Sequence, residues 1–363
     1  MPARSSDSVR NAGASSSLPK SKDSTKKIVY LFGAGATHAE LAALLPDLSP
    51  ETDGLLLGNV SSRVIARARS NPNYLRHLET VSATAGSLNI ELLIGLLESS
   101  KVQEWAAKTE LLRTLVSLDI RAILTPSRTK RFYLHRALLR LHRHPRVRSV
   151  EQVIGFISLN YDGVLDSAYR KFYGEPNYCF SLSDAAPSSR NIPLLKLHGS
   201  FTWKNLRIQG RRREIDIIPM GSHKTYLHAP YGFIWTRALQ ILVDCDILRL
   251  VGCSLSHNDA HLTDLLFKAH LERSKAFEIQ VIDKPSAGQL IRTTYGFFPG
   301  IRTLSELENL LVPEPDPRNP YRTWLKYKSL RMLGESRALR LSPLAQLLPE
   351  DGNDAKSTTT FAS

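Results

Sequence analysis

The stretch that decides the fold is IVYLFGAGAT, residues 28–37, in which an apolar run breaks into a glycine turn. The apolar part, Ile28 to Phe32, is typical of a strand that is buried on both faces. The following small residues are typical of a tight turn that opens a helix. Because N–H groups at a helix start favour an anion, the turn is a candidate phosphate-binding loop. Its members are Gly33, Ala34, Gly35, Ala36 and Thr37.

Four more short apolar runs follow, at residues 153–157, 192–197, 246–251 and 277–282. Helical stretches separate most of them, and this alternation predicts an α/β fold with a Rossmann-like parallel sheet and helices on both faces. Residues 40–149 instead carry Leu and Ala at helical spacing, which predicts a large helical insertion. The expected parts of the chain are a disordered tail at 1–26, a nucleotide-binding domain at 27–312, a C-terminal extension at 313–348 and a second disordered tail at 349–363.

Polar residues follow the predicted strands, and the carboxyl ends of parallel strands meet at one edge of a sheet. We therefore expect these side chains to share a ligand site. They are Asn160, Asp162, His198, Gly252, Ser254 and Asp259. The alternatives stay open for single residues: Asp162, Ser254 and Asp259 could each cap a helix, and His198 could be a buried histidine without a ligand.

The glycine turn lacks the full fingerprint of a dinucleotide-dependent dehydrogenase. The third glycine is replaced by His38, and the next segment is helical where that fingerprint needs a second strand with an acidic end. Hydride transfer is therefore disfavoured. His38 and Glu91 are expected at the surface, and Trp203 and Trp235 are expected in the core.

The composition narrows the function classes. The chain has 363 residues and a formal net charge of +14, so it attracts anions such as nucleotides. Its three cysteines form no close pair, which predicts no disulfide framework, no zinc site and a reducing, cytoplasmic location. No uncharged apolar run is long enough for a membrane span. A basic helix at 128–148, with eight Lys or Arg residues, is either a solvated face or a weak nucleic-acid contact.

Four segments in this order carry a resemblance: GAGAT at 33–37, SLNYD at 158–162, KLHGS at 196–200 and GCSLSHND at 252–259. Together they resemble the sirtuin-like family, and specifically its zinc-free bacterial branch of NAD-consuming domains found in antiphage defence. The resemblance extends from about Lys27 to Lys284. The chain departs from the pattern at Ser158-Leu159, where the family often has two threonines, and at Cys253, where it often has tyrosine.

The resemblance implies an NAD⁺ hydrolase that releases nicotinamide and ADP-ribose. It implies that Asn160 and His198 act on the ribose and the attacking water, and that Asp162 holds the nicotinamide side or fixes Asn160. It assigns Gly33, Ala34, Gly35 and Thr37 to the diphosphate and ribose, and Ser254 and Asp259 to the adenosine half. Ala36 and Gly252 are also expected among the NAD-binding residues. No zinc is expected.

Two other functions fit the same residues. One is a module that senses NAD or ADP-ribose without turnover, and the other is a transferase for ADP-ribose or acyl groups. The sequence is also compatible with a homo-oligomer or a regulatory partner protein, and it identifies neither.

Overall fold

The computed structural model of the chain describes most of its central part. The described residues are 25–45, 54–70, 90–99, 103–124, 133–185, 192–205, 207–208, 211–212, 229–255, 259–275, 277–298, 300–307 and 319–333. Several predictions concern residues outside these ranges. They are the tail at 349–363, nearly all of the tail at 1–26, residues 128–132 of the basic segment and the Ser256–Asn258 part of the last motif.

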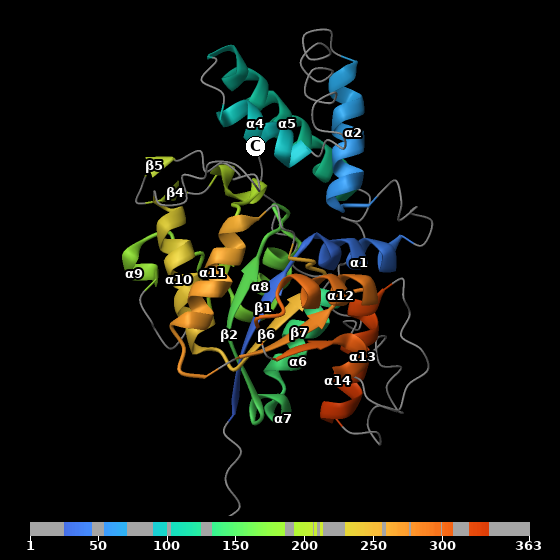
Figure 1. Cartoon of the computed structure of the whole chain (residues 1–363), viewed down its shortest axis with the longest axis vertical. Helices are drawn as coiled ribbons and strands as arrows, with labels where there is room; N and C mark the ends of the chain where they lie inside the picture. The colour runs from blue at the N-terminus through green and yellow to red at the C-terminus, as the bar shows by residue number, and fades with distance from the viewer. Residues whose placement is uncertain are drawn as a thin grey trace, which may run out of the picture.

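A parallel sheet forms the centre of the molecule (Figure 1), so the predicted α/β, Rossmann-like fold is confirmed. Its strand order is β3-β2-β1-β6-β7-β8. The strands are β1 (Lys26–Phe32), β2 (Glu151–Ser158), β3 (Leu194–Lys196), β6 (Ile247–Val251), β7 (Glu278–Ile282) and β8 (Ile301–Thr303). A second, two-stranded antiparallel sheet consists of β4 (Arg207–Ile208) and β5 (Arg211–Arg212). The central strands β1 and β6 are mostly apolar and buried because both faces of the large sheet are covered.

Helices cover the two faces of the sheet. One face carries α6 (Leu134–Arg143), α8 (Val164–Tyr173) and α14 (Pro320–Leu333), and the other carries α10 (Tyr231–Asp244) and α11 (Ala260–Leu271). The remaining helices of the lower part are α1 (Ala34–Leu44), α7 (Pro145–Arg148), α9 (Leu182–Ala185), η2 (Phe201–Asn205), α12 (Pro285–Thr294) and α13 (Leu304–Leu307). Trp203 and Trp235 are buried in this core, as expected. Among the helices described, none is long and apolar enough to cross a membrane.

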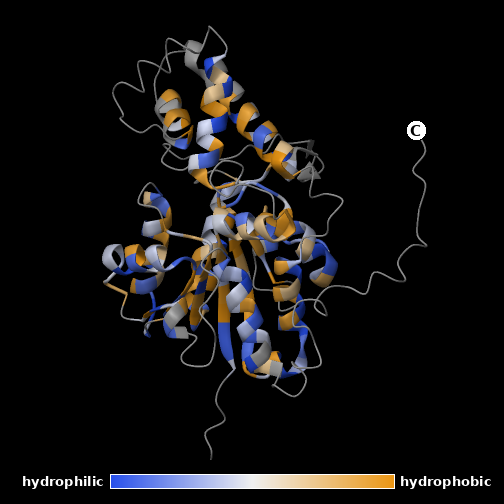
Figure 2. Ribbon diagram, turned by 90° about the vertical axis from the view of Figure 1, so that its right-hand side faces the viewer, coloured by the Kyte–Doolittle hydropathy of each residue, from blue (hydrophilic) through white to orange (hydrophobic). Residues whose placement is uncertain are grey.

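A separate group of helices lies beyond the carboxyl edge of the sheet. It consists of α2 (Leu57–Arg69), α4 (Ile90–Ser99) and α5 (Gln103–Leu124), which we call the helical module. Arg63 of α2 pairs with Asp119 of α5 through two parallel hydrogen bonds, a geometry that fixes both side chains. Hydrophobic positions recur along its helices (Figure 2). They belong to a second apolar cluster, which also takes in Leu41, Tyr161 and Phe201 at the carboxyl edge of the sheet. We propose that the helical module alone is the insertion. Helices α6 and α7 also lie in the predicted range 40–149, but they pack on β2 of the sheet.

The C-terminal helix α14 is packed into the core of the lower part. Its Lys328 pairs with Glu151 of β2 at 2.7 Å, and Glu151 also pairs with Arg249 of β6 at 2.6 Å. Trp324 lies beneath both cations. Arg249 interrupts the apolar run of β6, and its charge is balanced by Glu151 of β2, on the other side of β1. We propose that the C-terminal extension is a structural part of this domain.

The basic segment predicted as one helix is two helices where it is described. Helix α6 ends at Arg143, and α7 begins at Pro145 with His144 as its N-cap. Proline has no N–H to donate to the preceding turn, so the chain bends there and starts a new helix. Arg143 donates a hydrogen bond to the carbonyl of Phe172 and so also contacts the protein itself. Nucleic-acid binding by this segment stays a prediction.

Candidate functional site

The site lies where the strand order reverses. The chain runs from β1 outward to β2 and β3, then crosses to β6 on the other side of β1 and runs outward to β7 and β8, which makes the carboxyl ends of β1 and β6 a topological switch point. Here Gly35 donates its N–H to the carbonyl of Gly252 at 2.9 Å. A Cβ on Gly33 would lie 2.5 Å from that same oxygen. The glycines therefore permit close packing of two backbones as well as approach of a ligand.

Gly252 is the position where a side chain is least tolerable. Its φ is +56°, and a Cβ would lie 2.1 Å from the backbone nitrogen of Ala36. The left-handed conformation alone costs a non-glycine residue about 1–2 kcal/mol, and the overlap adds to that cost. We expect Gly252→Ala to lower the free energy of unfolding by more than about 2 kcal/mol, measured by urea denaturation. Gly58→Ala is the control, because a Cβ added at Gly58 would meet nothing within 4 Å. Equal stability of the two variants would contradict this account.

A cavity of about 440 Å³ opens beside the glycine turn, within the range of about 300–1,000 Å³ typical of small-molecule sites. It lies between the carboxyl edge of the sheet and the helical module. Most of the predicted site residues line it, namely Gly33, Ala34, Gly35, Thr37, Asn160, Asp162, Gly252, Ser254 and Asp259. Two do not: Ala36 is fully buried under the turn, and His198 is fully buried behind Asp259.

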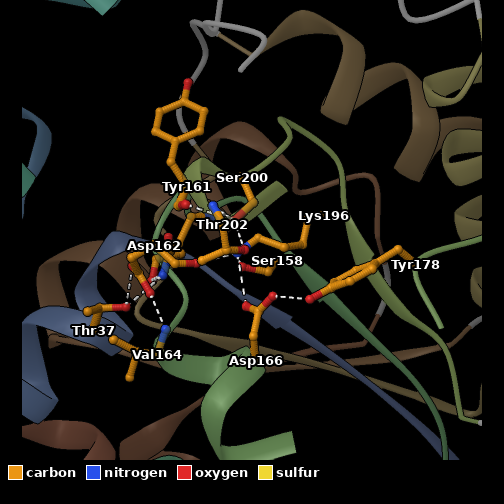
Figure 3. A network of polar contacts seen from close by, with 12 residues as sticks. Thr37, Ser158, Tyr161, Asp162, Val164, Asp166, Tyr178, Lys196, Ser200 and Thr202 are labelled. Carbon is orange, nitrogen blue, oxygen red and sulfur yellow. Dashed lines mark hydrogen bonds and ion pairs between the residues drawn. The ribbon is translucent and has the colours of Figure 1, made fainter. Parts of the chain in front are cut away.

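Asn160 and Asp162 are tied to the glycine turn through Thr37. The Asn160 amide donates to the carbonyl of Gly33 at 2.9 Å and to the hydroxyl of Thr37 at 3.0 Å. That hydroxyl donates in turn to Asp162 at 2.9 Å (Figure 3). The second carboxylate oxygen of Asp162 accepts the N–H of Val164 at the start of α8. Two loops that are more than a hundred residues apart in sequence are therefore held in one geometry.

The loop that carries Asn160 and Asp162 is also anchored from below by the third motif (Figure 3). Lys196 is fully buried, pairs with the buried Asp166 at 3.0 Å and donates to the carbonyl of Asp162. Ser200 donates to the carbonyl of Tyr161 at 3.0 Å. Tyr178 donates to the other oxygen of Asp166. Lys196 and Ser200 thus position the loop.

His198 forms a buried pair with Asp259. Nε2 of His198 lies 2.7 Å from a carboxylate oxygen of Asp259, and their side chains are 0% and 1% exposed. The other oxygen of Asp259 accepts the N–H of Leu262 and caps α11 at 3.2 Å. Tyr161 and Trp235 lie with their rings edge-on to the imidazole. The structure thus brings His198 next to the cavity, with Asp259 between them.

The cavity is acidic although the chain is strongly basic. Its described lining carries the carboxylates of Glu91, Asp162, Asp259 and Asp283, against the single ammonium of Lys284. Burial, then Glu91, raises the pKa of the lining Tyr161 well above its usual value, so it remains a phenol that donates to Glu91 at 3.1 Å. Such a lining favours a group that carries or develops positive charge.

Cys253 also lines the cavity, but it is not an activated nucleophile. Burial raises the pKa of its thiol to about 12, so the thiol stays protonated at neutral pH. Cys179, Cys245 and Cys253 are all free thiols. Among the described residues, no three His, Cys, Asp or Glu side chains are grouped as a metal site.

Residues 155–286 match the family model of the SIR2-like domain. This segment of the chain is thus similar to the SIR2-like domain of the sirtuin-like family. Three of the four motifs, at 158–162, 196–200 and 252–259, lie wholly inside the matched segment, and the glycine turn at 33–37 lies before it. No curated protein matches the sequence.

Several solved structures resemble this chain at low sequence identity. One structure, described as "Structural Basis for the Mechanism and Regulation of Sir2 Enzymes", is 14% identical to this chain. The similarity covers 85% of this chain and 95% of that one, with a TM-score of 0.33. A Sir2 homologue in complex with NAD is 13% identical, with coverage of 85% and 92% and a TM-score of 0.33. Likeness at this level supports no conclusion about chemistry.

The cavity is also lined by residues that were expected elsewhere. His38 and Glu91 were expected at the surface, and both predictions are wrong: both side chains are buried and line the cavity. Burial, then Lys284, lowers the pKa of His38, which keeps its imidazole neutral at neutral pH. Asp283 and Lys284, at the end of β7, line the far side of the cavity. Because both residues follow a buried strand, the sequence could have indicated that they lie at the ligand site.

Proposed function

We propose that this chain is an NAD⁺ hydrolase that cleaves the nicotinamide–ribose bond and releases nicotinamide and ADP-ribose. The observation that carries the proposal is the Asn160–Thr37–Asp162 arrangement, in which the amide and carboxylate of one motif are bonded to the glycine turn of another at the wall of one cavity. The family match and the order of the four motifs support NAD as the substrate. The resemblance also supports a role in antiphage defence as part of this proposal.

The chemistry of the bond suits this cavity. Nicotinamide leaves as a neutral molecule from a cationic ring, so the reaction needs little acid catalysis at the leaving group. The ribose becomes positively charged as the bond breaks, and a preorganised acidic lining stabilises that charge more than it stabilises the substrate. The N–H groups of Gly33, Gly35 and Ala36 already bond to backbone carbonyls, so the start of α1 would attract the diphosphate through the positive end of the helix dipole. The diphosphate can thus be held without a basic side chain close to the reacting ribose.

The proposal is tested by incubating the purified chain with NAD⁺ and measuring nicotinamide and ADP-ribose by chromatography. We expect both products in equal amounts. Labelled acceptor protein in place of free ADP-ribose would identify a transferase. The absence of any product, even at high protein concentration and long incubation, would overturn the proposal.

One observation favours the sensing function as the second candidate: His198 is fully buried and does not reach the cavity surface. A sensing module predicts that NAD or ADP-ribose raises the melting temperature while no nicotinamide is released. Binding of free ligand at 100 times its Kd stabilises a folded protein by about 2.7 kcal/mol, so the effect is readily measured.

A further inference from the structure

The N-terminal end of α1 meets the cavity without an anion of its own. Its N-cap is Gly33, which makes no side-chain cap, and its first turn contains no acidic residue. Gly33, Ala34 and Gly35 all line the cavity, so this end of the helix borders the space that the substrate is proposed to enter. The positive end of the helix dipole favours a negative group there. A helix start alone identifies no ligand.

His38, one turn further along α1, brings an imidazole without a partner to the same place. It is 7% exposed and lines the cavity. Its Nδ1 is buried, and no described residue bonds to it, which is costly unless a ligand or water supplies the bond. Side chains of a helix lean toward its N-terminus, so His38 extends over Ala34. The imidazole is thus directed toward the end of α1 that attracts an anion.

Lys284 contributes a cation beside this imidazole. It is the N-cap of α12 and lines the cavity with an exposed side chain. Burial, then the ammonium of Lys284, lowers the pKa of His38, so the two side chains interact across the gap between α1 and α12. An anion bound beside them would offset both the burial and the repulsion that keep the imidazole neutral.

Three neutral titratable groups share the cavity with His38 and do not exchange protons near neutral pH. Burial raises the pKa of the phenols of Tyr161 and Tyr321 well above the usual value. Burial also raises the pKa of the Cys253 thiol to about 12. All three groups therefore keep their protons whether or not an anion is bound.

Carboxylates approach the imidazole from several elements. Those of Glu91, Asp162 and Asp259 accept hydrogen bonds from the protein. On α1 itself, Glu40 is fully buried and bonded within the interior. Burial raises the pKa of Asp283, at the end of β7, although its carboxylate accepts the N–H of the next residue. Asp283 is therefore the group that competes with the imidazole for a proton.

We propose that His38 binds the diphosphate of the substrate and takes up a proton from solvent as it does so. The inference rests on NAD being the substrate, as proposed above. In the free chain the imidazole is neutral, and Lys284 is the one cation among the described lining residues. The diphosphate brings negative charge to the imidazole and stabilises its protonated form. The imidazolium then donates a charge-assisted hydrogen bond to a phosphate oxygen.

Linkage gives the direction of the pH effect. A ligand that raises the pKa of His38 binds more tightly as the pH falls through the interval between the pKa of the bound state and that of the free state. Above and below this interval the affinity no longer depends on His38. Because one imidazole takes up at most one proton, the slope within the interval is at most about tenfold in affinity per pH unit.

The test measures the binding of ADP-ribose by titration calorimetry, since ADP-ribose carries the diphosphate but has no nicotinamide to lose. The difference in heat between two phosphate-free buffers of unlike ionisation enthalpy gives the number of protons taken up. For the wild type we expect an uptake of up to about one proton between about pH 5 and 7. His38→Asn should take up none and should bind about 10-fold more weakly at the acid end, with a smaller difference as the pH rises. His38→Gln is a second variant with the same expectation.

Two control variants identify the group that is protonated. Asp283→Asn should keep the uptake, because the proton resides on His38. His270→Asn removes a histidine of α11 that packs edge-on to Phe298 and is not part of the cavity lining. It should bind ADP-ribose with the affinity and the proton uptake of the wild type. Melting curves without ligand show whether each variant is folded.

The possible results separate this assignment from the hydrolase proposal. Proton uptake that persists in the His38 variants would overturn the assignment, and its loss in Asp283→Asn would move the proton to that carboxylate. Binding of ADP-ribose by the wild type without uptake would also overturn it, as would cleavage of NAD by a chain that does not bind ADP-ribose. In all these cases the hydrolase proposal stands. A chain that binds neither nucleotide and releases no nicotinamide would instead contradict the hydrolase proposal itself.

Discussion

Replacing Asn160 with alanine is expected to lower kcat for nicotinamide release by about 10²–10³-fold, the usual cost of removing one preorganised polar group from an active site. The Asn160 amide nitrogen is engaged by Gly33 and Thr37, so the orientation of the side chain is fixed. Among the described residues no donor reaches its amide oxygen, which leaves that oxygen available to a ribose hydroxyl or to the attacking water. Steady-state assays of nicotinamide release measure the effect.

A second measurement distinguishes an effect of Asn160→Ala on the reaction from an effect on NAD binding. Because the glycine turn itself remains, Asn160→Ala should still be stabilised by NAD in a melting experiment. Gln240→Ala is the control, since it removes an amide from the exposed side of α10, where Gln240 accepts a hydrogen bond from Arg237. Activity of Asn160→Ala within threefold of the wild type would show that this amide has no part in the reaction.

Local patterns explain why the core of the fold was predictable. The run at 28–32 is apolar on both faces, which is typical of a strand in a covered parallel sheet, and the glycines after it permit the approach of two backbones. The grouping of Asn160 and Asp162 with the turn followed from the rule that the ends of parallel strands share an edge. In each case the physical requirement is contained in a few adjacent residues.

Other features depend on contacts between distant segments. His38 resembles a surface residue in sequence, but it is buried because the helical module and the start of α12 lie over the cavity. Glu91 is buried by the same module and meets Tyr161 there. No local spacing encodes these encounters, nor the pairing of Asp259 with His198 across 61 positions. What the sequence did contain was a lysine at the end of a buried apolar run, Lys196, which requires a buried carboxylate somewhere in the chain.

Lys196→Met is expected to lower the free energy of unfolding by about 3–5 kcal/mol, because it leaves a buried carboxylate without its cation. Lys196 and Asp166 are 1% and 0% exposed and lie 3.0 Å apart. The same ammonium also donates to the carbonyl of Asp162, so the variant releases the loop that carries Asn160. Urea denaturation measures the loss of stability, and the hydrolysis assay should show a loss of activity at temperatures where the variant is still folded.

Two further variants show whether the loss of stability in Lys196→Met comes from the buried, uncompensated charge of Asp166 or from the loss of a lysine as such. Lys268→Met removes a lysine from an exposed pair with Asp264 on α11 and should cost less than about 1 kcal/mol. Adding Asp166→Asn to Lys196→Met removes the uncompensated charge, so the double variant should be more stable than Lys196→Met alone. It should nevertheless stay poorly active, because nothing then holds the Asp162 carbonyl from below. If Lys196→Met and Lys268→Met proved equally stable, the buried pair would have no part in holding the loop that carries Asn160.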